Sequence, residues 1–282
     1  MILRTDHGAA YYQFEHLAAF PEIRHGVFSR APGCSEAPFH RLNVSLAVGD
    51  DVQRVERNRR RVADCMQADA LVFARQVHGN SIVVIDGRPV SPGAREETAI
   101  PVGDAMVTDQ PGKFLVVSVA DCQPILMYDP RRGLVANVHS GWRGSVANVA
   151  GRTVAVMAER FGCDPGDVRV GIGPSLGPCC AEFTNYREEI PPELWGYRRD
   201  SARFDFWAMS CDQLIRAGVP RDQIHVSGLC TKCGTDRFFS YRAEKTTGRF
   251  PAVIGLRRVE RLPPEARGPG NEPLTPNIAF AE

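Results

Sequence analysis

The chain has 282 residues, 43% of them hydrophobic, which is enough for a substantial core in one large domain or two closely packed small ones. Its 34 basic and 33 acidic side chains leave a formal net charge of +1, so it lacks the positive excess that is typical of proteins that bind nucleic-acid polymers. No apolar run approaches the roughly 20 residues that a membrane-spanning helix needs, and the first residues lack the pattern of a secretion signal, so we expect a globular cytoplasmic protein.

The first predicted element is a surface helix at residues 51–64, where three valines recur among charged side chains. Asp50 stands directly before this helix and is a suitable N-cap. The run of three arginines at 59–61 is expected to form a solvated face, although Arg59 can also reach an anionic ligand from the helix.

Strands follow this helix. The β-branched apolar runs at 71–77 and 81–85 predict two strands or one bent strand, with His78 at the turn that separates them. Glycine, proline and charged residues at 87–103 predict a loop, and residues 103–112 predict a short strand that ends in a Pro-Gly turn.

Three apolar runs then predict consecutive strands at 114–119, 124–128 and 134–138. The sequence DPRRG between the last two is typical of a hairpin turn. Cys122 and His139 are therefore expected at strand ends. A histidine at such a corner can cap a turn, act as a general base or bind a metal, and the corner alone does not choose among these roles.

Helices and strands alternate beyond His139. Residues 146–161 predict an amphipathic helix that begins after the N-cap candidate Ser145 and ends at Gly162. The remaining elements are expected as a strand with a glycine-rich turn at 168–177, a helix at 206–218, and strands at 224–229, 237–242 and 251–259.

The helix at 206–218 is expected to place four apolar side chains on one side: Trp207, Cys211, Leu214 and Ile215. Residues 263–282 are dense in proline and glycine and predict a loose tail after a single domain at 1–262. Strands and helices are mixed but do not form a clean βαβ series, so we predict a mixed-sheet α/β or α+β fold.

His78, Cys122 and His139 form the most informative group of polar residues. Two imidazoles and a thiolate at turns or strand ends match a catalytic zinc site, in which three protein ligands leave a fourth position open for water or substrate. The neighbouring residues suit this chemistry, because a carboxylate such as Asp121 can carry a proton and an arginine such as Arg143 can hold a phosphate or a developing anion.

Further candidates for substrate binding are polar residues near the predicted strand ends and the first helix. Gln76 stands two residues before the first histidine of the trio, at the same-face spacing of a strand. Asn43 and Ser45 alternate with apolar residues, and they can either line a pocket or cap a turn. The glycine-rich segment 171–177 matches neither a dinucleotide-binding nor a P-loop pattern, so it predicts only a tight turn.

The nine cysteines are odd in number and irregularly spaced, which favours reduced thiols over a disulfide framework. Cys230 and Cys233 form a CxxC pair, but without a second pair or a nearby histidine the pair does not predict a complete tetrahedral metal site. Cys179 and Cys180 are adjacent in sequence, so we expect them not to face one site and to pack in the interior.

Six segments resemble, in order, the motifs of the laccase-domain or polyphenol oxidase family, whose members are also described as purine nucleoside phosphorylases and peptidoglycan editing factors. They are RQVHGN (75–80), GDAMVTD (103–109), VADCQPI (119–125), VHSGWRG (138–144), IGPSLGPCCAEF (172–183) and SGLCTKCGTDRFFSYRAEKTTGR (227–249). The resemblance extends from about Arg24 to Val259. One departure is RAEKTTGR at 242–249, because the family more often has aspartate and glycine after SYR.

This resemblance implies a mixed β-sheet sandwich flanked by helices in a single compact domain. It implies a zinc ion bound by three residues: His78, Cys122 and His139. It also implies that adenosine, inosine, guanosine and methylthioadenosine are cleaved by phosphate, with adenosine deamination as a further activity. For this chemistry Asp121 is the candidate proton carrier, and Arg143 and Arg59 are the candidates for binding phosphate.

Three alternatives remain open. Copper is disfavoured as the metal, because a multicopper oxidase needs more histidine ligands than the seven scattered histidines of this chain readily offer. A hydrolase that edits peptidoglycan precursors would instead use Cys122 as a free nucleophile with a histidine as base, a role to which a zinc-bound thiolate is poorly suited. A binding module without catalytic activity predicts neither metal nor turnover.

Overall fold

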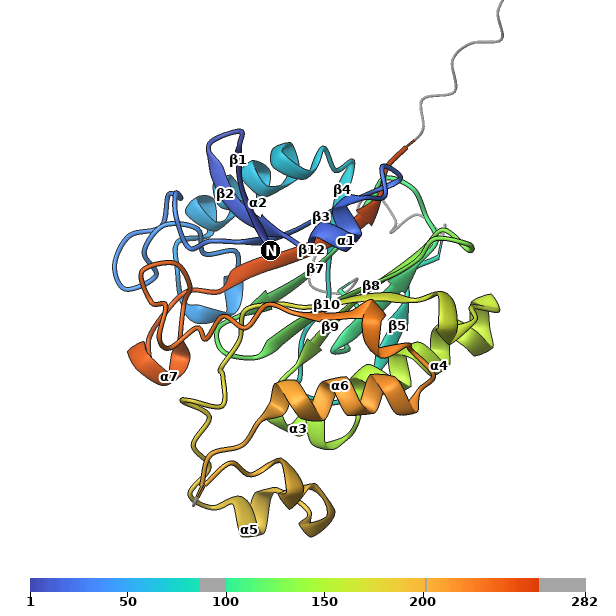
Figure 1. Ribbon diagram of the computed structural model, residues 1–282. Coiled ribbons are helices and arrows are strands. Elements are labelled where there is room, and N and C mark those ends of the chain that lie inside the picture. The colour runs from blue at the N-terminus through green and yellow to red at the C-terminus, as the bar shows by residue number, and fades with distance from the viewer. Residues whose placement is uncertain (87–99, 201, 259–282) are drawn as a thin grey trace, which may run out of the picture.

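The computed structural model describes residues 1–86, 100–200 and 202–258, and these form two six-stranded sheets packed face to face (Figure 1). Sheet 1 contains, in spatial order, β1 (Ile2–Asp6), β2 (Ala9–Gln13), β3 (Ile23–Phe28), β12 (Phe250–Leu256), β7 (Lys113–Val119) and β4 (Ala70–Phe73). Sheet 2 contains β11 (Ile224–Val226), β10 (Arg169–Ile172), β8 (Gln123–Asp129), β9 (Leu134–Ser140), β6 (Ala105–Thr108) and β5 (Ile82–Val84). The predicted mixed sandwich is confirmed.

Helices cover the outer faces of the sandwich. The described helices are α1 (Glu15–Ala18), α2 (Val52–Met66), α3 (Trp142–Val146), α4 (Val149–Phe161), α5 (Tyr186–Glu189), α6 (Phe206–Arg216) and α7 (Tyr241–Glu244). In Figure 1, α2 lies over sheet 1, whereas α4 and α6 lie against sheet 2 on the opposite side. No helix among the described residues is long and apolar enough to cross a membrane.

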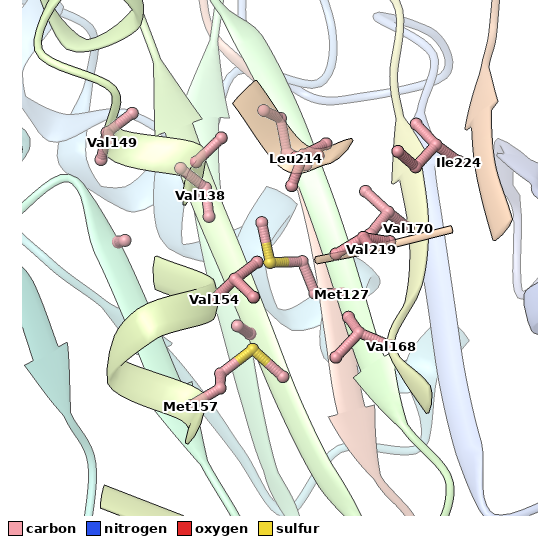
Figure 2. Close-up of a cluster of buried hydrophobic side chains, with 14 of the residues drawn as sticks. Met127, Val138, Val149, Val154, Met157, Val168, Val170, Leu214, Val219 and Ile224 are labelled. Atoms are coloured by element: carbon pink, nitrogen blue, oxygen red, sulfur yellow. The ribbon is translucent and has the colours of Figure 1, made fainter. Parts of the chain in front are cut away.

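Apolar burial holds these layers together. Figure 2 shows Val154 of α4 and Leu214 of α6 directed toward Met127 on the outer face of sheet 2. Each is at most 1% exposed, and burying a side chain of this size stabilises the fold by about 1.5–3 kcal/mol. Between the sheets, Asn137 of β9 donates hydrogen bonds to the backbone oxygens of Leu115 and Ala252 in sheet 1, at 2.8 and 2.9 Å.

The predicted surface helix is present as α2, with a different N-cap. Asp51, not Asp50, is the N-cap of the helix, and its carboxylate accepts a hydrogen bond from the Arg54 amide at 2.9 Å. The Asp50 carboxylate instead accepts from the Asn43 side chain at 2.8 Å. Asp50 is thus engaged by the preceding loop, which leaves the next aspartate to cap the helix.

The two runs around His78 form separate strands in different sheets. β4 pairs with β7 in sheet 1, and β5 pairs with β6 in sheet 2, both in parallel. The connection therefore crosses from one sheet to the other, and His78 lies in it with φ +59°. The predicted hairpin of β8 and β9 is confirmed, and its antiparallel register sets Pro124 opposite His139.

The helix predicted after Ser145 is divided in two. Ser145 lies inside α3 with its hydroxyl 2.9 Å from that of Ser140, and Asn148 caps α4 by accepting from the Gly151 amide. The left-handed backbone of Asn148, at φ +56°, breaks the helix at this point. Gly162 ends α4 at φ +67°, as predicted.

Two further expectations are wrong. Residues 237–242 form no strand, because the hydroxyl of Ser240 caps α7 and also donates to the Asp121 carboxylate, which bends the chain. Ile215 does not share the buried side of α6, since it is 39% exposed, and Met209 fills the interior instead. The tail at 263–282 and most of the loop at 87–103, namely 87–99, lie outside the described residues.

The expected arrangement of the cysteines is also wrong. The sulfur atoms of Cys179, Cys180, Cys230 and Cys233 all lie within 4.8 Å of one another, although the first two are adjacent in sequence. A turn at 178–180 points both thiols to the same side, and neither is buried.

Stability is expected to fall at acidic pH because of His25. This residue is 1% exposed, and its Nε2 accepts a hydrogen bond from the Phe14 amide at 2.9 Å, which requires a neutral ring. Burial, with a smaller contribution from His16, lowers its pKa to about 3. The unfolded chain binds the proton near pH 6.5, so this contribution is complete above that pH and decreases as the pH falls toward 3, by up to about 1.4 kcal/mol per unit.

A His25→Gln variant keeps an acceptor for the Phe14 amide but does not titrate. Denaturant unfolding of both proteins between pH 7 and pH 4 should give a shallower loss of stability for the variant. Equal slopes would contradict this account of His25.

Candidate active site and metal centre

A cavity of about 1280 Å³ lies where β4, β7 and β9 end and β8 begins. Its lining comes from both sheets, from the start of α3, from residues 182–185 and from α7. The antiparallel hairpin of β8 and β9 and the crossing connection after β4 therefore deliver side chains from distant parts of the sequence to one place.

His78, Cys122 and His139 meet in this cavity. One ligand atom from each, an imidazole nitrogen or the thiol sulfur, lies within 4.8 Å of the other two. The imidazole rings stand nearly perpendicular, at 81°, with their centroids 4.9 Å apart. His139 is almost fully buried and Cys122 partly buried, whereas His78 is exposed, so the trio forms one wall with an accessible side.

Asp104, a buried residue directly before β6, positions both histidines. One of its oxygens lies 2.8 Å from Nδ1 of His139, which leaves Nε2 as the ligand atom. The same carboxylate accepts from the amides of His78 at 2.9 Å and Gly79 at 2.7 Å. The pKa of Asp104 is lowered, because the hydrogen bonds from His139 and these amides outweigh the opposing effect of burial. Sequence reasoning missed this residue, although it lies in GDAMVTD.

The thiol of Cys122 and the ring of His139 stabilise each other's charged form in the metal-free chain. Burial alone would raise the pKa of Cys122, but His139 and His78 outweigh it and lower that pKa to about 6. Burial would likewise lower the pKa of His139, yet Cys122 and Asp104 raise it to about 9. The chain thus presents a thiolate, which is the form of cysteine that binds metals.

Close packing around the trio favours glycine at position 141. A Cβ there would lie 3.1 Å from both the Cys122 sulfur and Cδ2 of His78. Two non-glycine residues of the site also have left-handed backbones, His78 at φ +59° and Asp121 at φ +86°. Such conformations cost energy and persist because surrounding hydrogen bonds fix them.

Asp121 lines the cavity, and its carboxylate accepts hydrogen bonds from the segment that forms the neighbouring wall. Its oxygens accept from the hydroxyls of Thr231 at 2.6 Å and Ser240 at 2.7 Å, and from the Arg242 amide at 2.6 Å. The side chain therefore joins the start of β8 to the segment that carries α7.

Two further predicted site residues, Gln76 and Ser45, line the cavity, and a third, Asn43, does not. Gln76 lines the cavity and bridges to β7, donating to the Ser118 backbone oxygen and accepting from its amide. Ser45 lines it and accepts from the Ala47 amide. Asn43 does not line it, because its buried amide binds Asp50 and the backbone of neighbouring loops.

Among the described residues, five arginines and five aromatic rings also line the cavity, together with aliphatic and small polar side chains. The arginines are Arg59, Arg75, Arg143, Arg242 and Arg249, against three acids, Asp121, Glu182 and Glu189. Arg143 is exposed, with its guanidinium 4.2 Å from the Trp142 ring. Arg59 packs over Phe73 at 4.0 Å and donates to the Val44 backbone oxygen, which places it on the cavity side of α2. The aromatic lining residues are Phe73, Trp142, Phe183, Phe206 and Tyr241.

Arg249 is a second residue that sequence reasoning missed. Burial lowers its pKa, while Cys122 and Asp121 act in the opposite direction, so its charge lies close to both. The only sequence signal for it is its place at the end of the segment TTGR.

The donor set fits zinc better than copper. Two imidazoles, a thiolate and an open side are the elements of a catalytic zinc site, and the carboxylate behind His139 is the usual support of a metal-bound histidine. A blue-copper site with the same three ligands commonly adds a weak methionine ligand, and no methionine is among the described residues that line the cavity, although Gln76 and Gln123 are. Only two histidines, His78 and His139, are among them, too few for a multicopper cluster.

Comparison with known proteins supports a shared architecture. Residues 24–257 match the family described as multi-copper polyphenol oxidoreductase laccase. The chain is 38% identical over 245 residues to a protein of Geobacillus stearothermophilus named purine nucleoside phosphorylase YlmD, an alignment that covers 82% of this chain and 89% of that protein. A protein of Bacteroides thetaiotaomicron named purine nucleoside phosphorylase is 32% identical over 241 residues, which cover 81% of this chain and 89% of the relative.

Solved structures agree with this relationship. The crystal structure of YlmD from Geobacillus stearothermophilus superimposes with a TM-score of 0.80 at 35% identity and covers 91% of this chain and 99% of that one. A Bacillus licheniformis hypothetical protein, YfiH, gives the same TM-score at 34% identity, with 90% and 99% coverage.

Replacing Asp104 with asparagine is expected to weaken zinc binding at the trio about 10- to 100-fold, because the charge that orients His139 is lost. Competition with a chromophoric chelator measures this affinity, and Cys122→Ala identifies the share of binding that belongs to this site. Asp109→Asn is the matched control, since this exposed aspartate follows the same strand, away from the trio. Equal zinc affinity of the two folded variants would contradict the role of Asp104.

Proposed function

The chain belongs to the multi-copper polyphenol oxidoreductase laccase family, and we propose that it is a zinc-dependent purine nucleoside phosphorylase. The observation that carries this proposal is the convergence of the His78, Cys122 and His139 trio, five arginines and five aromatic rings in one cavity. The names of the relatives point to the same reaction.

The proposed substrates are adenosine, inosine, guanosine and methylthioadenosine. Aromatic rings such as Trp142 and Phe183, whose centroids lie 6.0 Å apart in a T-shaped arrangement, offer faces on which a purine can stack. A purine base has little charge and much flat surface, so this part of the lining suits it better than it suits a polyanionic or aliphatic ligand.

The arginines suit the second substrate, phosphate. A guanidinium matches phosphate oxygens with two parallel N–H donors, and Arg143, Arg59 and Arg249 line the same cavity as the trio. In phosphorolysis a phosphate oxygen bonds to C1′ of the ribose while the bond from C1′ to the purine nitrogen breaks. The electron pair leaves with the base, which takes up a proton, and the products are the free purine and ribose 1-phosphate, or methylthioribose 1-phosphate when the substrate is methylthioadenosine.

Zinc, when bound to the trio, supplies a Lewis acid that polarises a substrate atom and lowers the pKa of water toward about 7. The residues around the zinc site have separate roles. Asp104 holds His139 in one tautomer, and the arginines position phosphate. Asp121 remains the candidate proton carrier for the departing base and for the further activity, in which adenosine and water give inosine and ammonia.

A hydrolase that acts through Cys122 is a second candidate, because His139 and His78 stabilise the thiolate in the metal-free chain. The two proposals give opposite responses to metal. Zinc is required by the phosphorylase but blocks a free cysteine nucleophile, so removing it abolishes the first activity and exposes the second.

Purified protein with inosine is expected to release hypoxanthine only when phosphate is present. The Cys122→Ala variant should lose both this activity and the zinc bound by the trio. Cys34→Ala, which changes a cysteine outside the cavity, should retain both. Zinc binding at the trio without any phosphate-dependent release would contradict the proposed function.

Replacing Arg143 with alanine should raise the apparent KM for phosphate about 10- to 100-fold, because a charge-assisted hydrogen bond contributes about 1.5–3 kcal/mol. Initial rates at saturating inosine and varied phosphate measure this change. Arg152→Ala removes an exposed arginine of α4 outside the cavity and serves as control. A phosphate dependence equal to that of the control would remove Arg143 from this role.

A further inference from the structure

A second group of possible metal ligands lies outside the trio. Cys179 and Cys180 come from the turn after β10, and Cys230 and Cys233 come from the segment after β11. All four sulfur atoms lie within 4.8 Å of one another. The two segments are separated by about fifty residues of sequence, so only the fold brings these thiols together.

The separations between the sulfur atoms match metal coordination. The Cys233 sulfur is 3.7 Å from that of Cys179 and 3.6 Å from that of Cys180. Four thiolates at about 2.3 Å from a tetrahedral zinc ion have neighbouring sulfurs about 3.8 Å apart. A disulfide would need a separation of about 2.05 Å, and all four cysteines are free.

Backbone hydrogen bonds hold the two segments of the cluster together. The Gly177 amide donates to the Cys230 sulfur at 3.4 Å. Ser175 and Cys230 form a parallel bridge, in which the Ser175 amide donates to the Leu229 oxygen and the Thr231 amide to the Ser175 oxygen, both at 3.1 Å. These bonds fix the two segments side by side before any metal binds.

The charge and the exposure of the cluster suit a cation. Four thiolates at this spacing would repel one another, and a divalent cation neutralises that repulsion when it displaces the thiol protons. Two of the four side chains, Cys179 and Cys233, are exposed, which gives an ion access from solvent.

We propose that Cys179, Cys180, Cys230 and Cys233 bind a second zinc ion, which serves as a structural clamp between the segments at 173–183 and 227–242. A closed set of four thiolates leaves no position for substrate, in contrast to the trio. Binding exchanges thiol protons for the ion and involves no change of oxidation state.

The clamp supports a wall of the cavity. Arg242 donates through Nη1 to the backbone oxygens of Cys180 and Glu182, and its amide donates to Asp121. Phe183 and Arg242 both line the cavity, and the guanidinium carbon of Arg242 lies 5.4 Å from the Phe183 ring. The proposed zinc therefore holds together the two segments that carry this part of the lining.

Zinc stoichiometry of the full chain tests the proposal. Elemental analysis after equilibration with Zn²⁺ and removal of loosely bound metal should give two zinc ions per wild-type chain and one for Cys122→Ala. Adding Cys179→Ser or Cys233→Ser to Cys122→Ala should remove the last ion. Adding Cys34→Ser instead, as the matched control, should leave it in place.

X-ray absorption at the zinc edge of the Cys122→Ala protein should show four sulfur neighbours and no nitrogen, a signature that differs from that of the trio. The exchanged cysteines at 179 and 233 are exposed, and circular dichroism checks that the variants remain folded. A zinc-free Cys122→Ala protein, a retained ion after either serine substitution, or a disulfide within the cluster of the freshly purified protein would each overturn the proposal. None of these readouts depends on phosphorylase activity, so failure of one proposal does not imply failure of the other.

Discussion

One buried carboxylate sets the geometry on which the candidate site depends. Asp104 lies at the start of β6 between two segments that would otherwise be independent, the connection from β4 to β5 and the end of β9. It accepts from the amides around His78 and from the ring of His139. Because a buried charge is stable only when donors surround it, the same interactions that satisfy Asp104 also fix the positions of both histidines.

On the opposite wall of the cavity, a second carboxylate is also surrounded by hydrogen-bond donors that fix the neighbouring segments. Asp121 satisfies its carboxylate with two hydroxyls and an amide from the segment after β11, and the four-cysteine cluster joins that segment to the one after β10. The sandwich provides rigid strand ends, and these polar connections arrange the loops between them. Five arginines and five aromatic rings from the described part of the chain line the same cavity, a combination that suits a ligand pair of one anion and one flat base.

Local patterns in the sequence predicted the local structure well. The β8–β9 hairpin, α2 and the end of α4 at Gly162 each depend on residues that are close in the chain, and all three are present. Structural features that depend on residues far apart in the sequence were not predicted. Asp104 acts through a residue 35 positions away, Ser240 bends the chain because it binds Asp121, and the adjacent thiols of Cys179 and Cys180 meet a CxxC pair some fifty residues later.

The proposed phosphorylase activity is tested most directly by identifying the product that contains the ribose. Phosphorus NMR of a reaction containing the zinc-loaded protein, inosine and inorganic phosphate distinguishes transfer of the ribosyl group to phosphate from its transfer to water. We predict one equivalent of ribose 1-phosphate for each hypoxanthine released, because the role that we propose for the arginines of the cavity is to hold phosphate beside the sugar. Release of hypoxanthine with free ribose and no new phosphate ester would contradict the account.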